Sequence, residues 1–97
     1  MKKRIAIDLG ASNGRVLVGN LEEFEVVHRF TTHNDQILGE FYWNIQGLFS
    51  EIKTGLKKAF DCYPDEIVSI GIDTWGVDYA LVDGNGSLVS LCYHYRD

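Results

Sequence analysis

The chain has 97 residues, of which 45% are hydrophobic and 24% charged, which is the composition of a soluble globular protein with at most one domain. Its net charge of −5, with one basic cluster at residues 2–4, argues against a nucleic-acid partner, because such partners require a basic face. No apolar run has the length of a membrane span or of a signal peptide, so we expect a cytoplasmic protein without a membrane partner. Cys62 and Cys92 lack metal-ligand spacing, and we expect reduced thiols.

Two short apolar runs near the N-terminus, residues 5–9 and 16–18, predict a pair of strands. Between them, Asn13 and Gly14 are typical of a tight hairpin turn that needs positive φ. Gly10 allows the backbone of the turn to approach another backbone or a ligand closely. The sequence therefore predicts a hairpin with a small polar turn.

The side chains of this turn are suited to binding phosphate. Successive N–H groups in such a turn form a concave anion site, to which Ser12 adds a hydroxyl and Arg15 a cation. Asp8, at the end of the first strand, would repel phosphate but could hold Mg²⁺ through water. A plain hairpin with a surface carboxylate explains the same residues, and the motif alone does not decide between the two. The sequence contains neither a P-loop nor a dinucleotide-binding fingerprint.

The next segments predict a third strand and then a loop. Residues 24–30 form an apolar, β-branched run after a short turn, so the first three strands are expected to form an antiparallel meander. Residues 31–42 are polar and irregular, with Gly39 among them, and we expect a loop there.

A helix follows the expected loop. Asn44 is suited to its N-cap, and Pro64 prevents its continuation. Apolar residues recur behind Asn44 at helical spacing and form one stripe. They are Ile45, Leu48, Phe49, Ile52, Leu56, Ala59 and Phe60.

The remaining segments predict a strand and a hairpin. Residues 67–73 are apolar on both faces and follow the helix, which favours a buried strand parallel to the first. Residues 78–83 and 88–91 are expected to pair as a hairpin around 84–86. This order is that of an α/β protein with the N-terminal part of a ribonuclease-H-like fold: an antiparallel meander, a crossover helix, a parallel strand and a hairpin.

Two motifs resemble those of known proteins. Residues 8–15 (Asp-Leu-Gly-Ala-Ser-Asn-Gly-Arg) resemble the first phosphate motif of the actin-like ATPase superfamily, which includes actin, heat-shock chaperones and sugar kinases. Residues 70–79 (Ile-Gly-Ile-Asp-Thr-Trp-Gly-Val-Asp-Tyr) resemble a signature of the FGGY carbohydrate kinase family, in its branch that phosphorylates L-rhamnulose. Residues 28–30, 42–44 and 95–97 are similar at comparable spacings, so the resemblance extends over almost the whole chain.

The resemblance implies ATP-dependent phosphorylation of L-rhamnulose to L-rhamnulose 1-phosphate, a step of rhamnose catabolism, with Mg²⁺ as metal. The ATP phosphates would contact Ala11, Ser12, Asn13, Gly14 and Arg15. Asp8 would lie near Mg²⁺, and the sugar would lie at Gly76. Trp75 could stack on the sugar, although packing in the core explains a large aromatic residue equally well.

The chain differs from such kinases in length. They are several times longer and have two domains, and their general base lies past residue 97, so no residue here is assigned a catalytic role. We therefore expect residues 1–97 to be an incomplete N-terminal portion of the first kinase domain, inactive alone and weak in binding Mg-ATP. Exposed sheet edges also predict a dimer or larger homo-oligomer.

Three alternatives remain open on the sequence. The first is an FGGY kinase for another sugar, such as xylulose, fuculose or glycerol. The second is an activator ATPase of the same superfamily, which usually carries cluster-binding cysteines. The third is a non-catalytic module of the same fold that self-associates.

Overall fold

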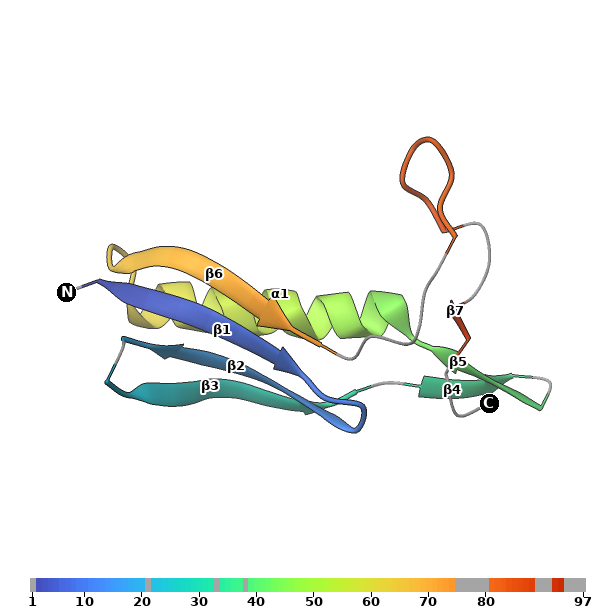
Figure 1. Ribbon diagram of the computed structural model, residues 1–97, viewed down its shortest axis with the longest axis horizontal. Helices are drawn as coiled ribbons and strands as arrows, with labels where there is room; N and C mark the ends of the chain where they lie inside the picture. Colours follow the sequence, from blue (N-terminus) through green and yellow to red (C-terminus); the bar gives the residue numbers. More distant parts are fainter. Residues whose placement is uncertain are drawn as a thin grey trace.

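The main sheet of the protein has four strands in the order β3-β2-β1-β6 and is covered on one face by the helix α1 (Figure 1). The computed structural model describes residues 2–20, 22–32, 34–37, 39–74, 81–88 and 92–93. A second sheet, of order β4-β5-β7, lies beyond the end of α1 at which the helix begins (Figure 1). The elements are β1 (Lys3–Leu9), β2 (Asn13–Gly19), β3 (Phe24–Thr31), β4 (Asn34–Ile37), β5 (Glu40–Trp43), α1 (Ile45–Cys62), β6 (Ile67–Asp73) and β7 (Cys92–Tyr93).

The predicted antiparallel meander is confirmed, with β2 between β1 and β3. Alternate residues of β1 and β2 are buried, as the apolar pattern predicts. This buried set, which packs with Leu48 and Ala59 of α1, consists of Ile5, Ile7, Leu9, Val16 and Val18. The intervening residues of both strands, among them Asp8 and Arg15, therefore lie on the face of the sheet away from α1.

The predicted helix and its cap are also confirmed. The side chain of Asn44 accepts a 2.8 Å hydrogen bond from the N–H of Gly47, which satisfies one free donor of the first turn. At the other end the N–H of Tyr63 donates to the carbonyl of Ala59, and Pro64 follows. Among the described residues, no helix combines the length and the apolar character that crossing a bilayer requires.

β6 is parallel to β1, as predicted, but the expectation that it is buried is wrong. Ile70 pairs with Ile5 and Ile72 with Ile7, so these residues lie on the helix face of the sheet. Nevertheless Val68, Ile70 and Ile72 are 52%, 50% and 62% exposed. The physical reason is that α1 packs against β1, β2 and β3, and within the described ranges no strand pairs with the outer edge of β6.

The expectation of a loop at residues 31–42 is wrong as well. β3 extends to Thr31, and β4 and β5 pair as an antiparallel hairpin in which Gly39 has φ of +83°. The outer partner of β5 is β7, where Cys92 pairs with Trp43, and both residues are buried. A partner so far along the chain leaves no signal in the local sequence, which explains the error.

The hairpin expected at residues 78–91 lies partly outside the described residues. Val82 and Leu88 form an antiparallel bridge, and the N–H of Asp83 donates to the carbonyl of Ser87 at 2.9 Å. Gly86 has φ of +83°, so the turn that the glycines predict is present. Residues 78–80 and 89–91 are not described.

Candidate functional site

The turn between β1 and β2 consists of Gly10, Ala11 and Ser12. The N–H of Gly10 donates a 2.9 Å hydrogen bond to the carbonyl of Asn13, which closes the turn. A Cβ atom on Gly10 would lie 2.9 Å from the same carbonyl oxygen, so a side chain would force the turn open. The close approach that the sequence predicts for Gly10 is therefore confirmed.

Asn13 and Gly14 do not form the turn, contrary to the prediction. Both belong to β2, and positive φ occurs elsewhere among the described glycines, at Gly39 and Gly86. Gly14 meets a different constraint, because a Cβ atom there would overlap the ring of Phe30 and lie 2.9 Å from its Cε1. The glycine leaves room for the aromatic ring that packs beneath this end of β2.

Thr32, which directly follows β3, holds the turn in place. Its side chain is buried, its hydroxyl donates to the carbonyl of Ala11 at 2.7 Å, and its N–H donates to the carbonyl of Ser12 at 3.0 Å. Within the described part of the chain, the N–H groups of Ala11 and Ser12 donate no hydrogen bond. The turn thus has its carbonyls engaged and its donors available, which is the arrangement that an anion needs.

Asp8 and Arg15 are direct neighbours across the β1–β2 pair. The Nη2 atom of Arg15 lies 2.5 Å from the Oδ2 atom of Asp8, and each side chain is 41% exposed. On the other side of Asp8, Asp73 of β6 is in register with it. Two carboxylates, at the last residue of β6 and the next-to-last residue of β1, therefore lie side by side near the turn, and that of Asp8 forms an ion pair with Arg15.

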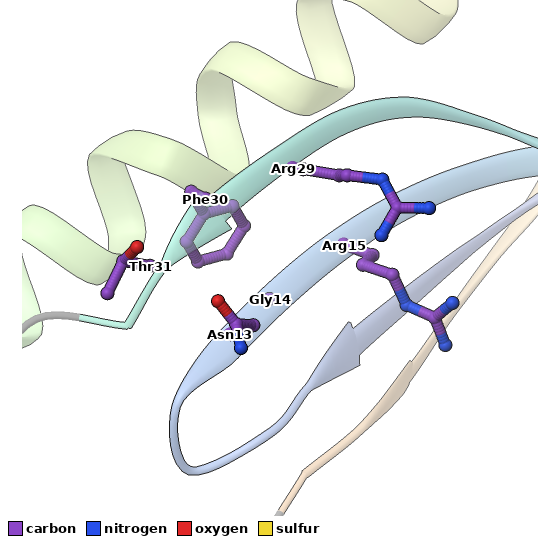
Figure 2. Close-up of a pocket in the computed structure, with 6 residues that line it drawn as sticks. All are labelled: Asn13, Gly14, Arg15, Arg29, Phe30 and Thr31. Atoms are coloured by element: carbon purple, nitrogen blue, oxygen red, sulfur yellow. The ribbon is translucent and has the colours of Figure 1, made fainter.

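Arg29 of β3 continues the row of charged side chains that crosses the main sheet. It pairs with Arg15 across β2 and β3, so Arg29, Arg15, Asp8 and Asp73 occupy successive strands of the main sheet. A pocket of about 470 Å³ lies at the arginine end of the row (Figure 2). Its lining residues are Asn13, Gly14, Arg15, Arg29, Phe30 and Thr31.

The structure thus brings together the predicted residues Asp8 and Ala11 to Arg15 at one end of the sheet. Thr32, Arg29 and Asp73 also lie at this end of the sheet, although they are not among the site residues predicted from the sequence. The alternation of β3 could have indicated Arg29 as a residue of the open face, but its pairing with Arg15 depends on strand register. Trp75 and Gly76 lie outside the described residues, so the sugar contacts remain a prediction.

No protein-family model matches the chain, but curated relatives do. The chain is 42% identical to the rhamnulokinase of Halalkalibacterium halodurans over 100% of its own length and 21% of that protein. It is 43% identical to the rhamnulokinase of Bacteroides thetaiotaomicron over 95% of its length and 20% of that protein. The chain therefore spans about a fifth of the curated relatives it matches.

Solved structures with a similar fold are sugar and polyol kinases. A ligand-bound xylulose kinase from Lactobacillus acidophilus matches with a TM-score of 0.74 over 96% of this chain and 19% of that chain, at 11% identity. A glycerol kinase from Plasmodium falciparum with ADP matches with a TM-score of 0.61 over 96% of this chain and 20% of that chain, at 15% identity. Identities this low bear on the fold and on nothing else.

The sheet and its crossover helix have the fold of the FGGY sugar kinases, which is an actin-like ATPase fold. The expected fold class is therefore confirmed. Within this class the chain is a homologue of the rhamnulokinases, to which it aligns over its whole length.

Proposed function

We propose that the chain forms the phosphate-binding side of an ATP-dependent kinase that converts L-rhamnulose to L-rhamnulose 1-phosphate. The observation that carries this proposal is the turn between β1 and β2, where the N–H groups of Ala11 and Ser12 have no hydrogen-bond partner among the described residues and lie near Asp8 and Arg15. Similarity to rhamnulokinases over the whole chain supports the choice of sugar.

The turn would bind ATP through its phosphates. The N–H groups of Ala11 and Ser12, the hydroxyl of Ser12 and the guanidinium of Arg15 are donors at the end of β1. Asn13 and Gly14 would approach the phosphates from the start of β2. Positioned donors of this kind stabilise charge on a transferring phosphoryl group, which is most of what phosphoryl transfer requires.

Asp8 and Asp73 fit a hydrated Mg²⁺ ion. Mg²⁺ prefers oxygen ligands and keeps several waters, so one or two carboxylates suffice. In the described part of the chain no group of three or more acidic, histidine or cysteine side chains is placed to hold a metal. A bound Mg²⁺ would neutralise phosphate charge, while Asp8 would hold its water shell and keep Arg15 oriented through the ion pair.

The remaining site residues concern the sugar. We propose that Gly76 lets the sugar approach the backbone and that Trp75 stacks on one sugar face, as the resemblance implies. In the sequence both come after Thr74, which follows β6, and the last residue of β6, Asp73, is in register with Asp8. The general base is assigned to no residue of this chain.

The test is an ADP-release assay on the full open reading frame that contains this chain. L-rhamnulose should be preferred over xylulose, fuculose and glycerol, and preference for another sugar would contradict the substrate. Arg15→Gln should raise the KM for ATP, whereas Lys57→Gln, which changes an exposed ion pair on α1, should leave it unchanged. The 97-residue chain alone should bind Mg-ATP weakly, and micromolar affinity in calorimetry would contradict this expectation.

A second candidate function is self-association, which exposed apolar residues support. We propose that a second copy of the chain covers the surface formed by Val68, Ile70 and Ile72 of β6 together with Phe49 and Phe60 of α1. Such a surface on an edge strand favours pairing. Light scattering should give the mass of a dimer or larger, and Ile72→Lys should shift it to the monomer. A monomeric wild-type chain would refute this candidate.

A further inference from the structure

The pairing of Arg15 with Arg29 is unusual because it places two positive charges opposite each other on one face of a sheet. Residues directly opposite in an antiparallel pair have Cβ atoms about 5 Å apart, and like charges there are destabilising. The positive charge of Arg15 is compensated by its ion pair with Asp8. Among the residues that the structure describes, Arg29 forms no ion pair and is exposed.

The carboxylate at the far end of the row is too distant to compensate Arg29. Asp73 lies on β6, three strand spacings from β3, which amounts to roughly 14 Å at about 4.8 Å per spacing. At that separation and physiological salt, exposed charges are largely screened from each other. Among the described residues, no carboxylate therefore compensates the positive charge of Arg29.

The surroundings of Arg29 form a cradle of donors. Asn13 pairs with Thr31 and Arg15 with Arg29, so all four side chains lie on the open face of the sheet. Between these two pairs lies the rung of Gly14 and Phe30, whose aromatic ring is on the helix face, so that only backbone separates the two pairs on the open face. Figure 2 shows both guanidinium groups extending in the same direction from neighbouring strands. Within the described ranges, the lining residues carry two guanidinium groups, an amide and a hydroxyl, and none of them carries a carboxylate.

We propose that Arg29 is a second anion-binding residue, which acts with Arg15 to bind a phosphoryl group in the pocket over the start of β2. Guanidinium groups bind phosphate through paired, charge-assisted hydrogen bonds. This inference rests on the proposed function of the same site and adds to it a residue and a second phosphoryl position.

The position of the pocket indicates a polyphosphate rather than a single phosphate. Asn13 directly follows the turn and lines the pocket. Arg15, two residues further along β2, also lines the pocket. A ligand with linked phosphoryl groups can place one at the N–H groups of Ala11 and Ser12 and the next between Arg15 and Arg29. A lone phosphate, or the phosphate of a sugar phosphate, can occupy one of these positions at a time.

The test is an NMR titration of the 97-residue chain with inorganic tripolyphosphate, and separately with orthophosphate and L-rhamnulose 1-phosphate. Tripolyphosphate should bind more tightly than the other two, with shifts at residues 11–15 and 29–31 that weaken as salt rises. Arg29→Gln should raise its Kd about fivefold, because the contact is exposed and screened, and Arg29→Lys should restore part of the loss. Arg4→Gln is the matched control, since Arg4 is also exposed on the open face but at the other end of β1.

Two results would overturn the inference. One is an Arg29→Gln chain whose Kd for tripolyphosphate equals that of Arg4→Gln, and the other is a wild-type chain with no response at 10 mM tripolyphosphate, a concentration that saturates exposed sites with Kd of about 1 mM. Equal affinity for orthophosphate would overturn the choice of a polyphosphate. The proposed kinase function is decided separately, by ADP release from the full reading frame, so the two failures are distinguishable.

Discussion

The hydroxyl of Thr32 donates a 2.7 Å hydrogen bond to the carbonyl of Ala11, and this bond ties the residue after β3 to the turn between β1 and β2. The backbone N–H of Thr32 adds a bond to Ser12. Residues at such turns usually hydrogen-bond locally, whereas here the partner lies 21 positions along the chain. The conformation of the turn is therefore a property of the whole meander.

Thr32→Val should remove the hydroxyl while keeping the shape of the side chain. The carbonyl of Ala11 then loses its donor, and we expect a loss of about 1–2 kcal/mol in the free energy of unfolding, measured by urea denaturation of the chain. Thr31→Val, at an exposed neighbouring position in β3, should change the stability by less than about 0.5 kcal/mol. Equal effects of the two substitutions would show that the bond contributes nothing.

Asp8→Asn should lower the activity strongly while lowering the stability only slightly. The ion pair with Arg15 is 41% exposed on both sides, so its loss should cost no more than about 1 kcal/mol in urea denaturation. In the full reading frame the same change should lower kcat at least about a hundredfold, because charge at the phosphates is then poorly balanced. Asp61→Asn, which breaks an exposed ion pair with Lys57, should leave kcat unchanged. A fully active Asp8→Asn enzyme would remove Asp8 from the proposed site.

Gly55→Ala should destabilise the protein, although alanine favours helices. A Cβ atom at Gly55 would lie 2.9 Å from the Cβ of Val16, which is completely buried and cannot move aside. Overpacking of about 1–3 kcal/mol should exceed the gain of about 1 kcal/mol in helix propensity. Thermal denaturation of both variants tests this prediction. Thr54→Ala, at the exposed neighbouring position, should be neutral or slightly stabilising in that experiment. A stabilised Gly55→Ala chain would mean that α1 does not touch β2 there.

Tyr63 should make stability depend on pH in the alkaline range. A hydrogen bond from its hydroxyl to the carboxylate of Glu25, together with the nearby negative charges of Glu25 and Glu66, raises its pKa to about 12. The folded state thus favours the protonated form, and this contribution is present below the ordinary pKa of about 10 and is lost as the pH rises toward 12.

Absorbance at 295 nm follows the ionisation of tyrosines and tests this prediction. The wild-type titration should contain a late component that Tyr63→Phe removes. Glu25→Gln should move that component back toward pH 10, since the accepting carboxylate is gone. A late component that survives both substitutions would belong to another tyrosine and would contradict the prediction.

The parts of the fold that the sequence predicts correctly are those with a strong local pattern. The alternation of Ile5, Ile7 and Leu9 indicates a half-buried strand, and the stripe behind Asn44 indicates the helix. The parallel pairing of β6 also follows, because a strand that returns after a crossover helix has few other places to go.

The errors all concern which distant residues do or do not come into contact, and the exposure of β6 is a case in which an expected cover is missing among the described residues. Trp43 pairs with Cys92, so the strand that ends at Trp43 appears locally as part of a polar loop. Gly14 is required by the ring of Phe30 and not by a turn. The site was predicted around Asp8 and the turn, but Thr32 and Arg29 join it through strand register, which a single sequence does not specify.

The row of charged residues from Arg29 to Asp73 also makes the distribution of charge on the open face of the sheet asymmetric. Its positive end lies on β3 and its negative end on β6, so an electric field runs across the strands at right angles to them. At physiological salt this field is screened within about 8 Å, so it acts on a ligand that has reached the sheet and not on one still approaching it. A ligand of the proposed kind, with phosphates and a bound cation, would therefore fit this face in one orientation only, with its phosphates toward β3 and its cation toward β6.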